Sequence, residues 1–294
     1  MQLPANGISI EVEDHGAPNA EPLLLIMGLG MQLVAWHEDF VARLVRRGFR
    51  VIRFDNRDIG LSQRFDTFGV PNLGLDALKF SLGMRVASPY TLADMAADSV
   101  GVLDALGIAK AHVCGASMGG MIAQQIAARH PERLRSMTLM MTSSGARRLP
   151  GPSLKVRGAM LSRPKVPTAI DSIVDHYVAL YRLIGSPGYP AADDYLRRRL
   201  DLSVRRSYRP AGTARQMVAI AADGDRSPLL AQIAVPTQII HGRDDPLVPV
   251  EAGRDLAAKI RGSRLDVIDG MGHDLPVPLW PRFIDAIAAV AGRA

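Results

Sequence analysis

The segment that most constrains this chain is AHVCGASMGG, residues 111–120. Residues 112–115 are typical of a short buried strand, and helix-forming residues follow from 121 to 128. Between them lies the G-x-S-x-G sequence of residues 115–119, with Ser117 at its centre. In this pattern the serine occupies a tight strand-to-helix turn and exposes its hydroxyl, while the glycines let two backbones approach closely. The segment therefore predicts a strand, a sharp turn at Ser117 and a helix.

Apolar runs and helical spacing alternate along most of the chain. Strands are predicted at residues 8–13, 23–27, 50–55, 135–142, 237–240 and 264–268. Helices are predicted at residues 40–47, 91–106, 173–183, 249–260 and 280–290. Residues 63–90 contain several Gly and Pro and are expected to form an irregular connection. The alternation favours an α/β fold with a mostly parallel, doubly wound sheet.

The alternation stops between residues 143 and 225, where helical segments and prolines occur without a convincing buried strand. We interpret this stretch as an inserted helical cap, with residues 1–142 and 226–294 as the core. Residues 144–215 contain 14 Lys and Arg against 5 Asp, whereas the net charge of the whole chain is +6. Such charge either attracts anionic substrates or forms a solvated helical exterior, and we favour the exterior.

Composition restricts the location and the partners of the protein. Cys114 is the one cysteine, so no internal disulfide can form. No apolar run is long enough to span a bilayer, and the N-terminus lacks the pattern of a signal peptide. The arginine run at residues 197–199 has no interleaved aromatic residues, which argues against nucleic-acid binding. We therefore expect a cytoplasmic protein with neither a nucleic-acid nor a membrane partner.

Two further motifs supply what a nucleophilic serine needs. A serine hydroxyl requires a base, and that base requires an orienting acid. HGRDDP at residues 241–246 and GMGHD at 270–274 directly follow the last two predicted strands. Because functional residues gather beyond the carboxyl ends of parallel strands, Ser117, Asp245 and His273 are expected to meet there. Asp244 is the competing candidate for the acid.

GASMGG, HGRDDPLVP and GMGHDLP, with DNRDIGLS at residues 55–62, resemble the α/β-hydrolase superfamily over nearly the full chain. Within the superfamily the chain resembles capped bacterial carboxylic-ester hydrolases. IMGLGMQLVAW, together with DNRDIGLS, is similar to the methylesterases of polyketide antibiotics such as aclacinomycin. The resemblance implies a serine hydrolase that cleaves carboxylic esters through an acyl-enzyme. In that pattern Ser117 is the nucleophile, His273 the base and Asp245 the acid.

The same pattern indicates where the oxyanion and the substrate would bind. The oxyanion donors are expected to be the backbone N–H groups of Leu29 and Met118. Trp36 and His37 follow the Leu29 loop and either line the substrate pocket or pack in the core. Tyr177 and Tyr181 either form the pocket roof or make ordinary helix contacts. The other histidines lack metal-ligand spacing and are interpreted as structural, and neither a cofactor nor a metal is expected.

Other functions remain compatible with these residues. The same triad can support C–C bond hydrolysis, lactone opening, thioester cleavage, acyl transfer or perhydrolysis. A receptor that keeps the fold and binds an apolar ligand without turnover is an alternative from a different class. The expected partner is a small-molecule ester, and the sequence leaves both a monomer and a homodimer open.

Overall fold

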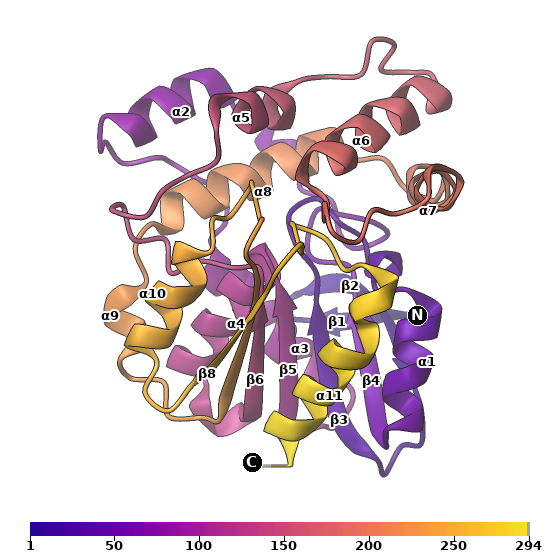
Figure 1. Cartoon of the computed structure of the whole chain (residues 1–294), viewed down its shortest axis with the longest axis vertical. Coiled ribbons are helices and arrows are strands. Elements are labelled where there is room, and N and C mark those ends of the chain that lie inside the picture. The colour runs from indigo at the N-terminus through magenta and orange to yellow at the C-terminus, as the bar shows by residue number, and fades with distance from the viewer. Residues whose placement is uncertain (293–294) are drawn as a thin grey trace.

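The computed structural model describes residues 1–292 and is built around one eight-stranded sheet (Figure 1). The strand order is β1-β2-β4-β3-β5-β6-β7-β8. β1 pairs antiparallel with β2 and β2 with β4, and all the other pairings are parallel, which confirms the predicted mostly parallel sheet. The strands are β1 (Gln2–Ala5), β2 (Ile8–His15), β3 (Glu21–Ile26), β4 (Phe49–Phe54), β5 (Ala111–Ala116), β6 (Leu134–Met140), β7 (Thr237–Gly242) and β8 (Arg264–Ile268).

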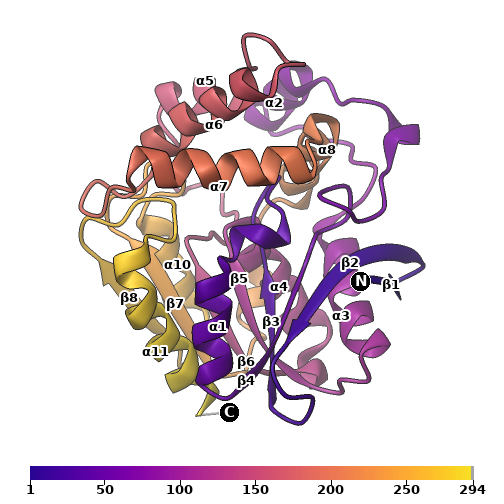
Figure 2. The ribbon, with the colours of Figure 1, turned by 90° about the vertical axis from the view of Figure 1, so that its right-hand side faces the viewer.

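Helices cover both faces of the sheet (Figure 2). Successive side chains of β3 point to opposite faces, so Leu24 and Ile26 join one apolar core while Leu23 and Leu25 join the other. The first core is covered by α3 (Leu92–Ala105), α4 (Met118–Arg129), α9 (Ser227–Leu230) and α10 (Glu251–Lys259). The second is covered by α1 (Glu38–Arg46) and α11 (Trp280–Ala291). The central strands are thus buried on both sides.

A helical layer lies over the carboxyl ends of the parallel strands (Figures 1 and 2). It contains α5 (Leu154–Leu161), α6 (Ile170–Ile184), α7 (Asp193–Arg206) and α8 (Pro210–Asp223). Ile173, Val174 and Val178 of α6 pack against Leu200 and Val204 of α7 in a small apolar cluster. We refer to α5–α8 as the cap; the domain boundaries at residues 143 and 225 stay a prediction.

Residues 63–90 are more regular than expected. They contain the short 3-10 helix η2 (Asp66–Phe68) and the helix α2 (Leu73–Ser81), so the expectation of an irregular connection is wrong. Asn72 caps α2, because its Oδ1 accepts a hydrogen bond from Leu75 N at 3.1 Å. α2 has no buried residue, which removes the apolar periodicity by which such helices are predicted.

Strand β1 was not predicted either. An Asn6-Gly7 turn joins β1 to β2, and both residues have positive φ, 49° and 76°. An Asn-Gly pair between two strands is a strong hairpin signal, so the sequence did contain the information.

Arginines of the cap attach it to the loop that follows β4. Arg206 of α7 donates a hydrogen bond to Asp55 at 2.7 Å. Arg215 of α8 donates two hydrogen bonds to Asp58, at 2.6 and 2.8 Å, and both side chains are only 1% exposed. Some arginines of the cap are therefore buried in ion pairs. The prediction of a solvated basic exterior holds only for the other basic residues of the cap. No helix within residues 1–292 has the length and apolarity needed to cross a membrane.

Candidate active site

Ser117 lies at the strand-to-helix turn that the sequence predicted, between β5 and α4. Its backbone has φ 54° and ψ −119°, a conformation that a non-glycine residue adopts only under strain. Ser117 N–H donates to Met140 O at 2.8 Å, and the carbonyl of Ser117 accepts from Thr142 Oγ1 at 2.7 Å. These bonds from the neighbouring strand β6 and the residues after it hold the turn in place.

Glycines allow the turn to pack this tightly. A Cβ on Gly115 would lie 2.2 Å from Gly119 O, and a Cβ on Gly119 would lie 2.1 Å from Ile26 O. Real Cβ atoms do not approach backbone oxygens so closely. The two motif glycines are therefore fixed by close approach between β5, the start of α4 and the end of β3.

The structure brings Ser117, His273 and Asp245 together. His273 Nε2 lies 3.1 Å from Ser117 Oγ, and His273 Nδ1 lies 2.7 Å from Asp245 Oδ2. The other carboxylate oxygen of Asp245 accepts hydrogen bonds from Leu247 N at 2.9 Å and Val248 N at 2.8 Å. With its carboxylate held in this way and fully buried, Asp245 fixes the orientation of the imidazole.

The two aspartates of the HGRDDP motif have different surroundings. Asp244 is exposed, and its Oδ2 accepts a hydrogen bond from Gly270 N at 2.8 Å, at the start of the histidine loop. It makes no bond to His273, whereas Asp245 does. The geometry therefore favours Asp245 over Asp244 as the acid.

His241 is buried beside this carboxylate, which fits a structural role. Its Nε2 donates to Val248 O at 2.8 Å and lies 3.8 Å from Asp245 Oδ2. Burial lowers the pKa of His241, so the ring is neutral at neutral pH. Within residues 1–292 its Nδ1 has no hydrogen-bond partner, and no group of three or more His, Cys, Asp or Glu there could hold a metal ion.

The loop after β3 approaches Ser117 as an oxyanion loop would. A Cβ on Gly28 would lie 3.6 Å from Ser117 Oγ, so the backbone next to Leu29 is adjacent to the hydroxyl. Met118 is the first residue of α4, where backbone N–H groups lack partners inside the helix. Neither Leu29 nor Met118 donates a backbone hydrogen bond within the described chain. Both N–H groups thus remain available, and their role as donors to an oxyanion stays a prediction.

The end of α6 is hydrogen-bonded directly to the histidine loop, a contact that sequence reasoning missed. His273 N donates to Ile184 O at 2.7 Å, and Gly272 N donates to Ser186 Oγ at 2.9 Å. The Ser186 hydroxyl in turn donates to the carboxylate of Asp274. Burial raises the pKa of that carboxyl group, which Ser186 partly offsets. The half-buried Asp274 therefore joins the cap to the loop.

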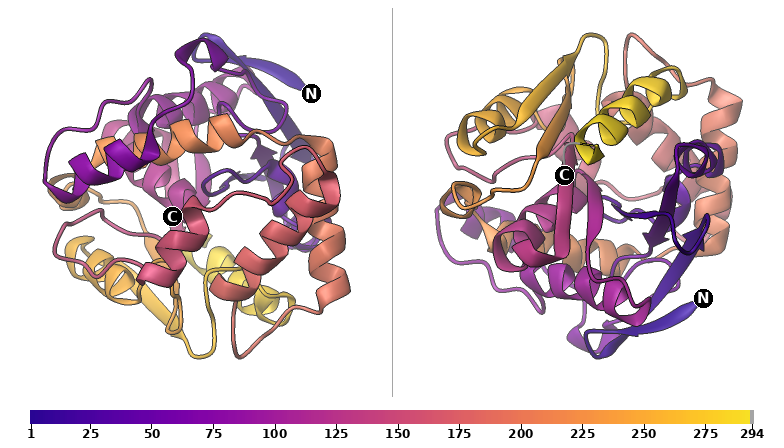
Figure 3. Two further views of the ribbon diagram at one scale, coloured as in Figure 1. Left: turned by 90° about the horizontal axis from the view of Figure 1, so that it is seen from above. Right: turned by 90° about the horizontal axis from the view of Figure 1, so that it is seen from below.

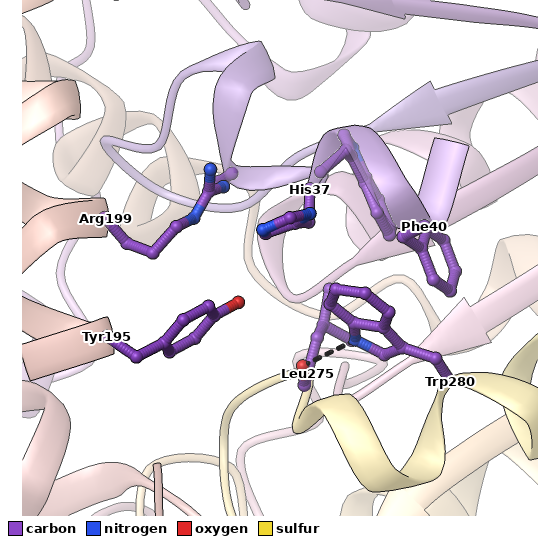
Figure 4. Close-up of a pocket in the computed structure, with 8 residues that line it drawn as sticks. His37, Phe40, Tyr195, Arg199, Leu275 and Trp280 are labelled. Atoms are coloured by element: carbon purple, nitrogen blue, oxygen red, sulfur yellow. Dashed lines mark hydrogen bonds between the residues drawn. The ribbon is translucent and has the colours of Figure 1, made fainter. Parts of the chain in front are cut away.

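Trp36 and His37 lie beside a small cavity between α7 and the α1–α11 side of the core (Figure 4). The cavity has a volume of about 50 Å³, and Tyr195 and Arg199 of α7 form its opposite wall. His37 also caps α1, since its Nδ1 accepts from Asp39 N at 3.0 Å. Ser117 does not line this cavity, so a substrate role of Trp36 and His37 stays a prediction.

The two tyrosines of α6 make different contacts. The Tyr181 hydroxyl donates to Met31 Sδ at 2.9 Å, next to the predicted oxyanion loop. Tyr177 packs edge-on against Tyr208 within the cap, and burial raises its pKa to about 12. Tyr181 thus lies beside the predicted oxyanion loop, whereas the contact made by Tyr177 is internal to the cap, and a substrate role of either stays a prediction.

Comparison with known proteins agrees with this geometry. The sequence matches the family described as alpha/beta hydrolase fold over residues 21–277. The chain belongs to this family. It is 30% identical to the rhodomycin D methylesterase DauP of Streptomyces sp. (strain C5), over 96% of this chain and 94% of that one. The rhodomycin D methylesterase DnrP of Streptomyces peucetius is 30% identical with the same coverage. The superfamily resemblance expected from the motifs is confirmed.

Solved structures share the fold at lower identity. The meta-cleavage product hydrolase CumD of Pseudomonas fluorescens IP01 has a TM-score of 0.74 and 21% identity, covering 100% of this chain and 97% of that one. The esterase RhEst1 of Rhodococcus sp. ECU1013 has a TM-score of 0.72 and 20% identity, covering 99% and 97%. These matches establish the α/β-hydrolase architecture alone.

Proposed function

We propose that this α/β hydrolase cleaves carboxylic esters through an acyl-enzyme formed on Ser117. The observation that carries the proposal is the unbroken line of contacts from Ser117 Oγ to His273 and from His273 to Asp245, at 3.1 and 2.7 Å. The ester-hydrolase part agrees with the methylesterase relatives DauP and DnrP.

The first half of the reaction forms the acyl-enzyme. Ser117 Oγ attacks the ester carbonyl while His273 Nε2 accepts the hydroxyl proton. The negative charge on the carbonyl oxygen is bound by the N–H groups of Leu29 and Met118, each donor of this kind being worth about 3–4 kcal/mol. The tetrahedral intermediate then collapses: the C–O bond to the alcohol breaks, and His273 returns its proton to the leaving oxygen.

The second half releases the acid. A water molecule donates its proton to His273 Nε2 and attacks the acyl carbon, and the Ser117–acyl bond breaks with return of the proton to Oγ. Asp245 carries no proton through the cycle; its buried carboxylate stabilises the imidazolium that forms in each half.

The preferred substrate is an apolar to moderately polar ester with a small alcohol. Because DauP and DnrP are named as methylesterases of rhodomycin D, a methyl ester is the first compound to test. Tyr181 and Met31 place an aromatic ring and a thioether beside the Leu29 loop, surroundings that favour an apolar acyl group.

Hydrolysis of p-nitrophenyl acetate and butyrate, followed by methyl esters of increasing acid size, tests this function. We expect multiple turnovers by the wild-type protein, and neither turnover nor labelling by a serine-directed phosphonate in Ser117→Ala. Ser162→Ala, which removes an exposed hydroxyl at the end of α5, is the matched control and should keep both turnover and labelling. Normal ester cleavage by Ser117→Ala would end the proposal, and a single stoichiometric burst would favour a receptor.

A further inference from the structure

Exposed large apolar side chains are concentrated on α2, on the cap helix α5 and on the segments that flank these two helices. Eleven of the fifteen such side chains in residues 1–292 lie in the segments 68–84 and 154–170. Leu78 and Leu82 are 55% and 66% exposed, and Leu154 is 84% exposed. We call the exposed apolar side chains of these two segments the outer patch. α2 and α5, which carry much of it, both lie at the end of the molecule opposite the C-terminus (Figures 1 and 3).

The outer patch is accompanied by positive charge. Residues 144–170 contain six Lys and Arg and no Asp or Glu, and all six are exposed. Elsewhere on the cap, exposed arginines pair with carboxylates: Arg182 with Asp193, Arg198 with Asp194 and Arg205 with Asp201. In the part of the chain that the structure describes, Lys155, Arg163 and Lys165 form no ion pair. Arg148 of this segment pairs with Asp255, whereas these three cations are free to bind an external anion.

A cavity of about 220 Å³ opens at the edge of the patch. Phe80, Met84 and Val86 supply apolar walls, and Arg85 and Arg147 supply the cations. The Arg147 guanidinium lies close to α2, since a Cβ on Gly83 would be 2.7 Å from its Nη1. Neither arginine pairs with a carboxylate anywhere in residues 1–292. Two unpaired guanidinium groups above an apolar wall match a phosphate that carries aliphatic chains.

From these observations we infer that the outer patch docks this protein on the surface of an anionic phospholipid bilayer. The apolar side chains of α2 and α5 enter the boundary between headgroups and acyl chains, while the cations bind lipid phosphates. The expectation of no membrane partner rested on the lack of a spanning segment, which does not bear on binding at the interface.

Charge argues against a second copy of this chain as the occupant of the patch. In a two-fold contact between copies of this chain, the same patch meets itself. The six cations of residues 144–170 in each copy would then share one interface, in which the two patch segments supply a single carboxylate per copy, that of Asp76. α2 and α5 also lie along the outer edge of the helical layer, a position that suits contact with a flat lipid surface (Figure 2).

Vesicle flotation with the full chain tests the inference. Vesicles with equal parts of phosphatidylglycerol and phosphatidylcholine are compared with vesicles of phosphatidylcholine alone. We expect the protein to float with the mixed vesicles, at least about tenfold more than with the neutral ones, and to be released by high salt. Absence of binding to the mixed vesicles would overturn the inference.

Variants identify the surface that binds. Leu78→Asp/Leu82→Asp and Lys155→Glu/Lys165→Glu should each lower binding at least about tenfold. Leu202→Asp is the matched control, because Leu202 is 48% exposed on α7 outside the patch. Ester hydrolysis in solution shows that each variant is folded. An equal loss of vesicle binding in Leu202→Asp would contradict lipid docking. So would the absence of vesicle binding together with a dimer, seen by light scattering, that Leu78→Asp/Leu82→Asp disrupts.

Discussion

Ser186, just after cap helix α6, accepts a hydrogen bond at 2.9 Å from the backbone N–H of Gly272, the residue before the proposed catalytic histidine. His273 N donates to Ile184 O at 2.7 Å, and Asp274 accepts from the Ser186 hydroxyl. Three consecutive residues of the histidine loop are thus bound to the end of one cap helix. The position of His273 relative to Ser117 consequently depends on the cap.

Replacing Ser186 by Ala should weaken the connection between the cap and the histidine loop. The buried Gly272 N–H would lose its acceptor, at a cost of about 1–3 kcal/mol in the free energy of unfolding. Because the histidine loop becomes less ordered, kcat for p-nitrophenyl butyrate should fall while KM changes little. Steady-state kinetics and thermal unfolding check this, with Ser162→Ala as the control. A wild-type kcat in Ser186→Ala would show that the Ser186 hydroxyl does not position His273.

Adjacent aspartates provide a matched pair of variants. Asp245→Asn removes the acceptor that orients His273 and should lower kcat by about 10⁴-fold. Asp244→Asn should change kcat less than about threefold, since an amide oxygen can still accept the Gly270 hydrogen bond. The pair is compared at saturating substrate. The reverse order of effects would assign the acid to Asp244.

The close approach at the turn predicts which glycines can be replaced. Gly119→Ala places a Cβ 2.1 Å from Ile26 O, so the start of α4 must move away from β3. Overpacking usually costs about 1–3 kcal/mol, and we expect Gly119→Ala to lower the free energy of unfolding by at least about 3 kcal/mol. Gly158→Ala in α5 meets no atom within 4 Å and should stabilise by up to about 1 kcal/mol. Denaturant unfolding compares the two, and equal stability would contradict the packing described here.

The local motifs allowed the centre of the fold to be predicted from the sequence. The turn at Ser117 and the loops of Asp245 and His273 each carry their signal within a few residues. Parallel strands then place such loops at one edge. Most strand boundaries were within two residues of those observed, because buried strands have apolar side chains on both faces.

The contacts of the cap could not be predicted in the same way. Ser186 and Gly272 are 86 residues apart, and neither belongs to a recognisable motif for such a bond. Arg206 and Asp55 are 151 residues apart, and nothing local distinguishes Arg206 from the exposed Arg205. Helix α2 was missed because its apolar side chains face outward. These features depend on tertiary contacts or on surfaces, for which a single sequence has no periodic signal.

The buried pair of Arg215 and Asp58 predicts a pH-dependent variant. Burial opposes the charge of Asp58, but the hydrogen bonds from Arg215 outweigh it and hold the pKa of Asp58 below its usual value. The pair therefore stabilises the fold above about pH 3.9 and loses this contribution as Asp58 becomes protonated. Arg215→Met leaves a buried carboxylate without its cation, at a cost of about 3–5 kcal/mol at neutral pH.

In Arg215→Met, burial should raise the pKa of Asp58, so acidification neutralises the carboxylate. The difference in unfolding free energy between variant and wild type should therefore shrink as the pH falls from 7 towards about 4. Urea unfolding of both proteins at several pH values measures this difference. Arg205→Met, which removes an exposed partner of Asp201, should show little change at any pH. A deficit independent of pH would exclude an unpaired Asp58 as its cause.

The central claim is that Ser117 carries the acyl group during turnover. Rapid acid quenching of the reaction with p-nitrophenyl butyrate, followed by mass spectrometry of the intact protein and its peptides, tests it directly. We predict a mass gain of one butyryl group on the peptide that contains Ser117 in the wild-type protein, and none in Ser117→Ala. A butyryl group on a different residue, or full turnover by Ser117→Ala, would contradict the account.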